Sequence, residues 1–303
     1  MKVGIMLPIG DTDGPSGSPT FQDVMAAARA AEDGGLDSVW LADHFLYRAQ
    51  DGREFGLHEA WTLLSGIAAV TNRVQLGTLV LCTSFRNPVL TAKMAATLDV
   101  VSNGRLVLGL GCGWHEPEYS AMGLPFAERV SEFAESIEII SRLLRGERLS
   151  HAGRHHRLTD AVLAPPPIRH IPILVAAKKP RMLRLAAQWA DAWNTAWYGR
   201  PNAVLDGRLA DFGAAMAEVG RPLAEVERTV GIDVRDSAQA AIPEPSPNAL
   251  GGDVDDLVGV LDAYSAMGID HVIVGLEPMT VRSVERLVQA VGLMTPSGRV
   301  SRG

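Results

Sequence analysis

The sequence has few cysteines, no excess of basic residues and no long apolar run. Its two cysteines, Cys82 and Cys112, cannot form a framework of several disulfides, and neither belongs to a Cys-x-x-Cys or His-rich metal motif. The formal net charge is -7 and the charges are interspersed, so no basic face indicates a nucleic-acid partner. The sequence contains neither a run of about 18 apolar residues, which a membrane span needs, nor a signal peptide. We therefore expect a cytoplasmic protein with no nucleic-acid or membrane partner.

A strand, a helix and a second strand follow one another between Arg73 and Tyr119. The two strands, Val74 to Leu81 and Leu106 to Leu110, are almost continuously apolar, and Asn87-Pro88 opens the helix between them. Continuously apolar strands are buried on both faces, as in parallel sheets covered by helices. The polar residues of this unit follow the strand ends, where α/β proteins bind their ligands.

The same alternation of strand and helix extends over nearly the whole chain. It favours a (β/α)8 TIM barrel in a single domain, residues 1–303, with an insertion after the fourth helix. The alternative is an open Rossmann-like sheet with an extra domain, but no Gly-x-Gly-x-x-Gly motif follows a strand. The eight expected strands are Val3 to Leu7, Ser38 to Ala42, Val74 to Leu81, Leu106 to Leu110, Ile171 to Ala177, Ala192 to Trp197, Thr229 to Val234 and His271 to Leu276.

Two segments interrupt the alternation. Residues 145–170 lack a sustained period and contain three consecutive prolines, which predicts an insertion with a short hairpin and an extended arm. Residues 236–252 form a long proline-rich loop and are a candidate lid. The insertion contains His151, His155 and His156, which we interpret as surface histidines because no carboxylate or cysteine partner is apparent.

Asp43 and His44 follow the second strand, at the end from which barrels present catalytic groups. A histidine there can serve as a general acid or base near neutral pH or hydrogen-bond a cofactor, and Asp43 can fix its tautomer. From the residues alone, a histidine that only satisfies a loop carbonyl is an equal alternative.

Other strand ends carry further candidate ligand contacts. Gly113 allows close backbone approach and Trp114 offers a stacking wall, whereas Cys112 has no evident base nearby and is interpreted as a packing residue. The turn formed by Ala176, Ala177, Lys178 and Lys179 precedes a helix whose N-terminus can bind phosphate; a solvated basic turn is the alternative.

Three more residues have positions that suggest contacts at the barrel mouth. Asn194 ends the sixth strand and is a candidate cofactor contact, and Trp197 is a candidate for the pocket wall. Glu277 ends the eighth strand and is a candidate substrate contact. Most barrel aromatics belong to the core, which is the alternative for Trp197.

Four segments together resemble the bacterial luciferase-like superfamily and, within it, the oxidoreductases that use the deazaflavin coenzyme F420. The segments are GLDSVWLADH from Gly35 to His44, LGTLVLCTSFRNP from Leu76 to Pro88, KMAATLDVVSNGR from Lys93 to Arg105 and GLGCGWHEPEY from Gly109 to Tyr119. The resemblance implies a TIM barrel that binds a flavin or deazaflavin at the carboxyl ends of its strands.

The resemblance also implies roles for individual residues. It places His44 at the cofactor ring, a non-proline cis peptide bond between Leu79 and Val80 behind the ring, and the backbone of Cys112 to Trp114 at the pyrimidine edge. It places the cofactor phosphate at the turn formed by residues 176–179. The sugar-phosphate-oxidising members have a glutamate where this chain has Trp114, which argues against a sugar-phosphate substrate.

The expected function is hydride transfer between coenzyme F420 and a small organic substrate, with His44 as the proton partner. One alternative is a reduced-FMN monooxygenase that uses oxygen, and another is a non-catalytic flavin-binding barrel. The resemblance further implies a homodimer formed through the second and third helices, where Leu63 and Met94 are candidate contacts.

Overall fold

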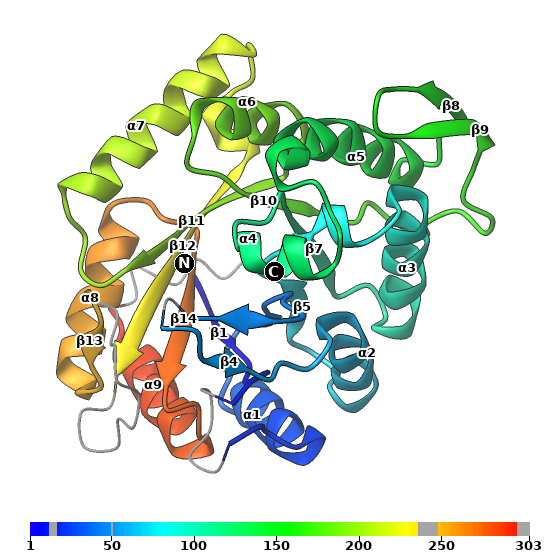
Figure 1. The fold of residues 1–303 in the computed structure, drawn as a ribbon. Helices are drawn as coiled ribbons and strands as arrows, with labels where there is room; N and C mark the ends of the chain where they lie inside the picture. The colour runs from blue at the N-terminus through cyan, green and yellow to red at the C-terminus, as the bar shows by residue number, and fades with distance from the viewer. Residues whose placement is uncertain (12–16, 50, 236–247, 296–303) are drawn as a thin grey trace.

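The computed structural model describes residues 1–11, 17–49, 51–235 and 248–295, and within them eight parallel strands close into a barrel. Around the barrel the order is β10, β11, β12, β14, β1, β2, β5 and β7, and β7 pairs back with β10. Helices surround the strands as a ring (Figure 1), which confirms the TIM barrel. The strands are β1 Lys2–Met6, β2 Ser38–Leu41, β5 Gln75–Thr78, β7 Leu106–Gly111, β10 Ile173–Ala176, β11 Ala192–Tyr198, β12 Glu227–Arg235 and β14 His271–Glu277.

A long helix follows each barrel strand in the described part of the chain. These helices are α1 Phe21–Asp33, α2 Ala60–Val70, α3 Pro88–Val101, α5 Arg129–Leu144, α6 Pro180–Trp189, α7 Ala203–Glu218, α8 Val254–Ala266 and α9 Val281–Leu293. Local sequence sets where several begin. Thr20 and Asp23 form a capping box at α1, and the Asn87 side chain accepts hydrogen bonds from Val89 and Leu90 at the start of α3.

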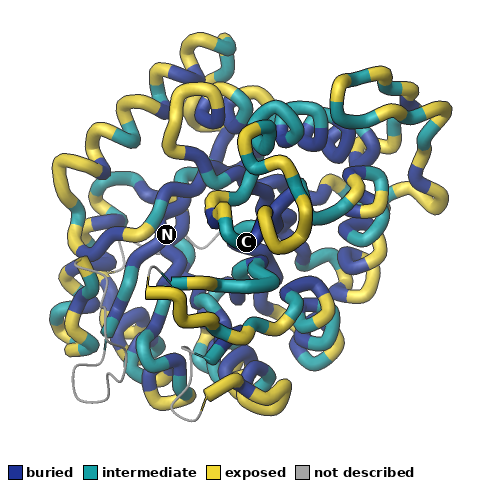
Figure 2. Tube along the Cα trace, in the orientation of Figure 1, coloured by how far each residue is buried: buried dark blue, intermediate teal, exposed yellow. Residues whose placement is uncertain are grey.

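The core has two parts, one between the strands and the helices and one inside the barrel. The outer part gathers the apolar faces of helices and strands, and Figure 2 shows the strands buried while the helices alternate between buried and exposed residues. The inner part is closed by Trp40, Leu79, Val107, Leu174 and Ile273. These side chains therefore fill the interior of the barrel and leave the carboxyl ends of the strands for a ligand.

Short elements that the sequence did not predict lie at the mouth of the barrel. The loop after β2 folds into an antiparallel pair, β3 Tyr47–Arg48 and β4 Glu54–Phe55, and a short helix, α4 Glu116–Ala121, follows β7. The single strand expected over residues 74–81 is divided into β5, which ends at Thr78, and β6 Leu81–Cys82. β5 pairs with the first residues of β7, and β6 pairs with its last residues.

The segment between α5 and β10 contains an antiparallel hairpin, β8 Leu149–Ala152 and β9 Arg157–Ala161, which projects beside α5 (Figure 1). Its histidines are not surface residues as predicted, because the side chains of His151, His155 and His156 are only 15%, 10% and 13% exposed. They face carboxylates of α5 and of the turn that precedes it, and His151 lies 3.3 Å from Glu135. Within the described ranges no group of side chains has the arrangement of a metal site.

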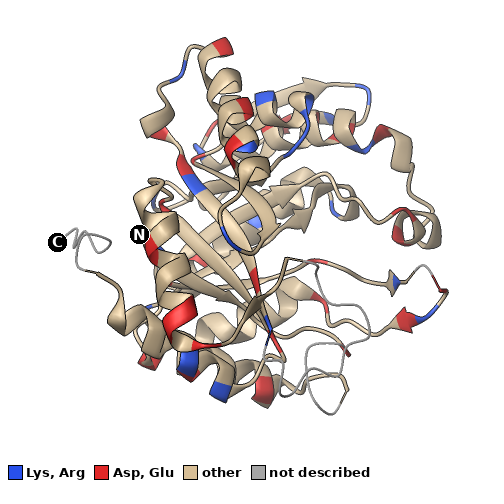
Figure 3. Cartoon of the chain, turned by 90° about the vertical axis from the view of Figure 1, so that its left-hand side faces the viewer, with Lys and Arg blue, Asp and Glu red and all other residues tan. Residues whose placement is uncertain are grey.

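Two expectations concern parts of the chain that are only partly described. Residues 236–247 of the candidate lid lie outside the described residues, and β13 Leu250–Gly251 pairs with the end of β12. None of the helices in the described ranges is both long and apolar enough to cross a membrane. Acidic and basic residues are interspersed over the helices seen in Figure 3.

Candidate active site

A cavity of about 350 Å³ opens at the carboxyl ends of the barrel strands. This volume suits a small organic ligand. Residues at the ends of β1, β2, β11, β12 and β14 line it, together with the β3–β4 pair: Met6, Leu7, Pro8, Ile9, Ala42, His44, Tyr47, Phe55, Leu57, Trp197, Asp233, Val234, Gly275, Leu276, Glu277 and Met279. Three of the residues predicted from sequence, His44, Trp197 and Glu277, therefore meet at one cavity.

His44 is held in place by Glu118, a residue that the sequence analysis did not select. The Nδ1 atom of His44 lies 3.1 Å from Oε2 of Glu118, whose side chain is only 2% exposed. The other oxygen, Oε1, accepts hydrogen bonds from the backbone N–H groups of Phe45 and Leu46. The carboxylate therefore fixes both the imidazole ring and the loop that carries it.

The protonation of Glu118 determines which nitrogen of His44 carries a hydrogen. Burial alone would raise the pKa of the Glu118 carboxyl, but hydrogen bonds from His44, Phe45 and Leu46 outweigh burial and hold the pKa below its ordinary value. An ionised carboxylate can only accept hydrogen bonds, so Nδ1 of the neutral imidazole must carry the hydrogen. Nε2 is then the ring nitrogen that can exchange a proton with a ligand.

Asp43 does not fix the tautomer of His44, contrary to expectation. Its carboxylate forms a bidentate ion pair with Arg86, at 2.7 and 2.9 Å, and accepts a hydrogen bond from the N–H of Cys82. Arg86 also pairs with Glu59, the residue that caps α2. Asp43 therefore joins β2, β6 and α2 beneath the site, and Glu118 takes the role expected of Asp43.

Aromatic rings surround His44 on the side away from the barrel axis. The rings of His44 and Trp114 are perpendicular with centroids 5.7 Å apart, and Tyr47 stacks on His115 at 4.9 Å. Burial lowers the pKa of His115, which accepts a hydrogen bond from the N–H of Arg48. Trp114 itself is 62% exposed, so the predicted stacking wall is open to solvent.

The end of β7 is arranged as a tight turn. Gly113 has a φ of 71°, and a Cβ at this position would contact the hydroxyl of Tyr119 and lie 2.8 Å from Sγ of Cys82. The Tyr119 hydroxyl donates a hydrogen bond of 2.6 Å to the carbonyl of Cys112. Burial raises the pKa of the Cys112 thiol, in keeping with a packing residue rather than a nucleophile.

The peptide bond between Leu79 and Val80 is cis, which confirms the expectation drawn from the resemblance. It lies at the interruption between β5 and β6. Leu79 and Val80 pack inside the barrel against the inner core.

The turn that precedes α6 has the features of an anion site. No side chain caps the N-terminus of α6, where Lys179 is the N-cap residue. Lys178 and Lys179 are exposed there, and Arg208 donates a hydrogen bond to the carbonyl of Lys178. Although the residue is exposed overall, desolvation of its ammonium group by nearby protein atoms, and then the charge of Arg208, lower the pKa of Lys178. Ala176 is the last residue of β10, and Ala177 follows it.

Asn194 lies inside the barrel and not at its rim. It is 2% exposed and its amide donates a hydrogen bond of 2.8 Å to the hydroxyl of Thr229 on β12. Trp193 points the other way and stacks on Phe212 of α7 at 4.3 Å. Of the tryptophans near β11, only Trp197 lines the cavity among the described residues.

The sequence analysis missed Glu118, Asp233 and Tyr47. Asp233 could have been noticed, because it is a charged residue two positions before the end of β12, at the carboxyl end of a barrel strand. Glu118 gave no such signal, since 74 residues separate it from His44 and only the fold brings them together.

Comparison with known proteins gives both F420-dependent dehydrogenases and monooxygenases as relatives. The chain is 36% identical over 178 residues to an F420-dependent glucose-6-phosphate dehydrogenase of Amycolatopsis mediterranei, covering 57% of this chain and 52% of the relative. It is 31% identical over 204 residues to the pyrimidine monooxygenase RutA of Allorhizobium ampelinum, covering 63% and 55%. The chain therefore spans about half the length of these relatives.

The fold agrees with a solved structure over almost its full length. An F420-dependent secondary alcohol dehydrogenase in complex with an F420-acetone adduct superposes with a TM-score of 0.79 at 18% identity, covering 99% of both chains. The family model for luciferase-like monooxygenases matches residues 1–243. The chain therefore belongs to the luciferase-like monooxygenase family.

Proposed function

We propose that this protein is an oxidoreductase that moves a hydride between coenzyme F420 and a small organic substrate. The observation that carries the proposal is the buried Glu118 carboxylate against His44, at the wall of a cavity at the carboxyl ends of the strands. The names of the F420-dependent relatives support the choice of cofactor.

The candidate cofactor residues and the cavity divide the barrel mouth into two halves. Leu79, Val80, Cys112 to Trp114 and residues 176–179 follow β5, β7 and β10, which are neighbours in the barrel. The cavity lies on the other half, among β11, β12, β14, β1 and β2. Residues of the first half would hold the cofactor beside the cavity, and His44, which lines the cavity at the end of β2 next to β5, would be within reach of a substrate there.

The residues present fit coenzyme F420. The uncapped N-terminus of α6 and the exposed Lys178 and Lys179 suit its phosphate, since backbone N–H groups and cations there favour an anion. When bound, the cofactor supplies a ring carbon that gives or takes a hydride. The backbone at Asp43 is the remaining proposed contact, whereas Asn194, buried inside the barrel and bonded to Thr229, is not among the contacts.

His44 is the proposed proton partner of the substrate. With Nδ1 donating to Glu118, Nε2 can accept a proton from a substrate that is oxidised or, when the ring is protonated, return one to a substrate that is reduced. Both states keep the same hydrogen bond to Glu118. The ring therefore need not reorient during turnover.

A reduced-FMN monooxygenase is the second candidate, and the relative named as a pyrimidine monooxygenase favours it. The basic turn at residues 178–179 would serve the FMN phosphate as well as that of F420. A non-catalytic flavin-binding barrel is less well supported, because such a protein would not need Glu118 buried against His44.

Cofactor titration tests the proposal. Quenching of tryptophan fluorescence, for which the chain has 6 tryptophans, should show micromolar or tighter binding of F420 and weaker binding of FMN. Replacing both Lys178 and Lys179 by alanine should weaken F420 binding roughly three- to tenfold, the scale expected for two exposed ion pairs. Arg29→Ala, at an exposed position on α1, is the matched control. Tighter binding of FMN, followed by oxygen consumption in its reduced form, would favour the monooxygenase.

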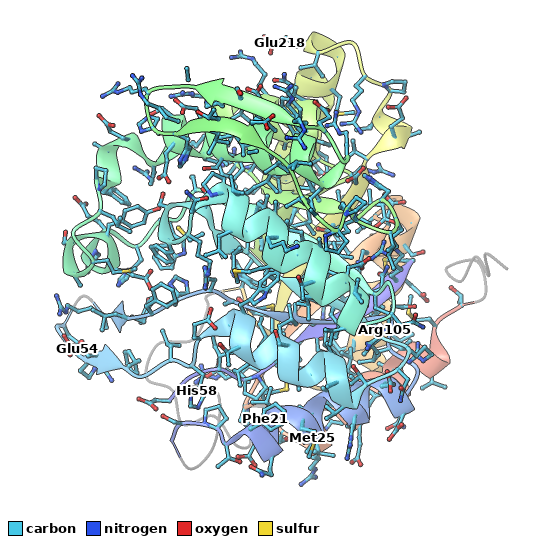
Figure 4. The ribbon with its side chains drawn as sticks, turned by 90° about the vertical axis from the view of Figure 1, so that its right-hand side faces the viewer. Phe21, Met25, Glu54, His58, Arg105 and Glu218 are labelled. Atoms are coloured by element: carbon cyan, nitrogen blue, oxygen red, sulfur yellow. The ribbon has the colours of Figure 1, made fainter. Side chains whose placement is uncertain are left out.

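We also propose that the protein forms homodimers through α2 and α3, which lie side by side on the face shown in Figure 4. Leu90, Val100 and Val101 of α3 are each more than half exposed, whereas Leu63 and Met94 are partly buried. Light scattering on the wild type and on Val101→Glu tests this proposal. A monomeric wild type would refute it.

We place the protein in the reducing cytoplasm, where the free thiols Cys82 and Cys112 would persist.

A further inference from the structure

The wall of the cavity formed by β12 and β14 is acidic. Asp233 of β12 and Glu277 of β14 both line it, and these neighbouring strands pair Asp233 with Gly275 and Arg235 with Glu277. No Lys or Arg is among the described residues that line the cavity. The residues before position 296 that are left undescribed, 12–16, 50 and 236–247, contain no Lys or Arg in the sequence either.

Two glycines allow an aromatic ring and a carboxylate to lie next to each other on this wall. A Cβ on Gly275 would lie 3.1 Å from Oδ1 of Asp233 and 3.8 Å from Cζ3 of Trp197. A Cβ on Gly231 would lie 2.8 Å from Cε3 of Trp197. The indole ring and the carboxylate therefore share the space above Gly275, and both face the cavity.

Arg235 pairs with Glu277, and one guanidinium does not cancel the charge of the two carboxylates on the wall. Its Nη2 lies 3.5 Å from Oε1 of Glu277, and it is not among the residues that line the cavity. Two carboxylates and one guanidinium leave a net charge of about -1 when all three are ionised. Asp233 lies two residues earlier on β12 than Arg235, next to Trp197.

A carboxylate beside an aromatic ring is suited to a cation. An ammonium group gains a charge-assisted hydrogen bond from the carboxylate and a cation–π contact from the indole ring. An anionic group such as a phosphate would meet two carboxylates and no cation on the cavity surface. The rest of the cavity is apolar, with Met6, Leu7 and Ile9 along one side.

We propose that the substrate of this protein is a small organic amine that enters the cavity as a cation. Asp233 and Trp197 bind its nitrogen, and its hydrocarbon part packs against Met6, Leu7 and Ile9. This inference rests on the proposed function for calling the ligand a substrate. The binding site itself depends only on the cavity.

Three ligands of nearly the same shape and different charge test the proposal. Cyclohexylamine, cyclohexanol and cyclohexanecarboxylate are titrated by calorimetry into the full-length protein at pH 7, where the first is a cation, the second neutral and the third an anion. We expect cyclohexylamine to bind at least tenfold more tightly than cyclohexanol and the carboxylate to bind most weakly. Equal affinities for the three ligands, or a preference for the anion, would overturn the proposal.

Variants then locate the site. Asp233→Asn should reduce the affinity for cyclohexylamine about tenfold and leave that for cyclohexanol unchanged, and Trp197→Leu should also weaken binding of the amine. Asp33→Asn, at an exposed position at the end of α1, is the control and should change neither affinity. An unchanged affinity for the amine in Asp233→Asn, with the thermal melting curve of the wild type, would contradict the assignment. If Asp233→Asn does not fold, Trp197→Leu decides.

Cofactor binding separates this inference from the proposed function. If F420 binds and the amine does not, the substrate class is wrong and the proposed function stands. If the amine binds through Asp233 and neither F420 nor FMN binds, the cation site stands and the proposed function fails.

Discussion

The replacement Glu118→Gln should move the hydrogen of the neutral His44 ring from Nδ1 to Nε2. In the wild type, Oε1 of Glu118 accepts from the N–H groups of Phe45 and Leu46, and Oε2 faces Nδ1 of His44. Glutamine has the same shape, but only one of its two terminal atoms can accept. The two backbone donors retain the amide oxygen, so the NH₂ group must face Nδ1, which then has to be the acceptor.

The size of the effect follows from the hydrogen bond that is at stake. A hydrogen bond to a charged group contributes about 1.5–3 kcal/mol. At 1.36 kcal/mol for each factor of ten, the wild type should favour the Nδ1–H form by roughly 10- to 150-fold. The variant should favour the Nε2–H form by a smaller factor, because its amide–imidazole bond is uncharged. A neutral His44 with hydrogen on Nε2 cannot accept a proton there, so substrate oxidation should slow by at least about tenfold.

Long-range ¹H–¹⁵N correlation spectra of the imidazole rings report the tautomer directly. The chain has 8 histidines, and His44→Asn identifies the relevant signals by their loss. Spectra are recorded at a pH at which the ring is neutral. Glu116→Gln, at an exposed position two residues earlier on α4, is the matched control and should retain the wild-type tautomer. The same tautomer in the wild type and Glu118→Gln would refute the assigned role of Glu118.

Three further predictions concern stability and thiol reactivity. Folding lowers the pKa of Glu118, so its contribution to stability is present above the ordinary carboxyl pKa and is lost as the pH falls through the lowered value. In urea denaturation, the free energy of unfolding of the wild type should therefore exceed that of Glu118→Gln near neutral pH, and the difference should narrow below about pH 4.5. Arg105, labelled in Figure 4, donates to the carbonyls of Ala68, Thr71, Val74 and Ser102, so Arg105→Met should lower the free energy of unfolding by about 2–4 kcal/mol, whereas Arg29→Met should change it by less than about 0.5 kcal/mol. Burial raises the pKa of Cys82 to about 12 and also raises that of Cys112, so iodoacetamide at pH 8 should label both only in urea; rapid labelling of the folded protein would contradict this.

The barrel could be predicted from sequence because its signals are local. Continuous apolar runs mark the parallel strands, and Asn87 and Thr20 mark helix starts through hydrogen bonds within a few residues. The same local reasoning did not predict the short helix α4, which follows β7 and precedes a 3-10 turn over Phe126–Glu128. This helix positions Glu118, so a fault in the predicted secondary structure hid a functional contact.

The partners of buried charges could not be predicted, because they depend on which strands become neighbours. Asp43 precedes His44 in sequence, which made it the natural candidate to orient the ring. In the barrel its side chain points to Arg86, 43 residues away, and Glu118 approaches His44 from α4. Successive residues after a strand commonly point in different directions, so adjacency in sequence was a poor guide to contact.

The division of the barrel mouth into two halves predicts that chemistry and substrate choice can be changed separately. Glu118 and Arg86, which support His44 and its neighbour Asp43, lie on α4 and after η1 Thr83–Phe85. Asp233 and Trp197, which we propose select the substrate, lie on β12 and β11. No hydrogen bond or ion pair in the described residues joins the first pair to the second.

Changes at independent sites usually add within about 0.5 kcal/mol, or roughly twofold in affinity. Glu118→Gln should therefore leave the cyclohexylamine affinity within about twofold of the wild type, and Asp233→Asn should leave the tautomer of His44 unchanged. The double variant should show both single effects at full size. A loss of amine affinity in Glu118→Gln comparable to that in Asp233→Asn would mean that the two sites are coupled, and would contradict the separation of chemistry from substrate choice.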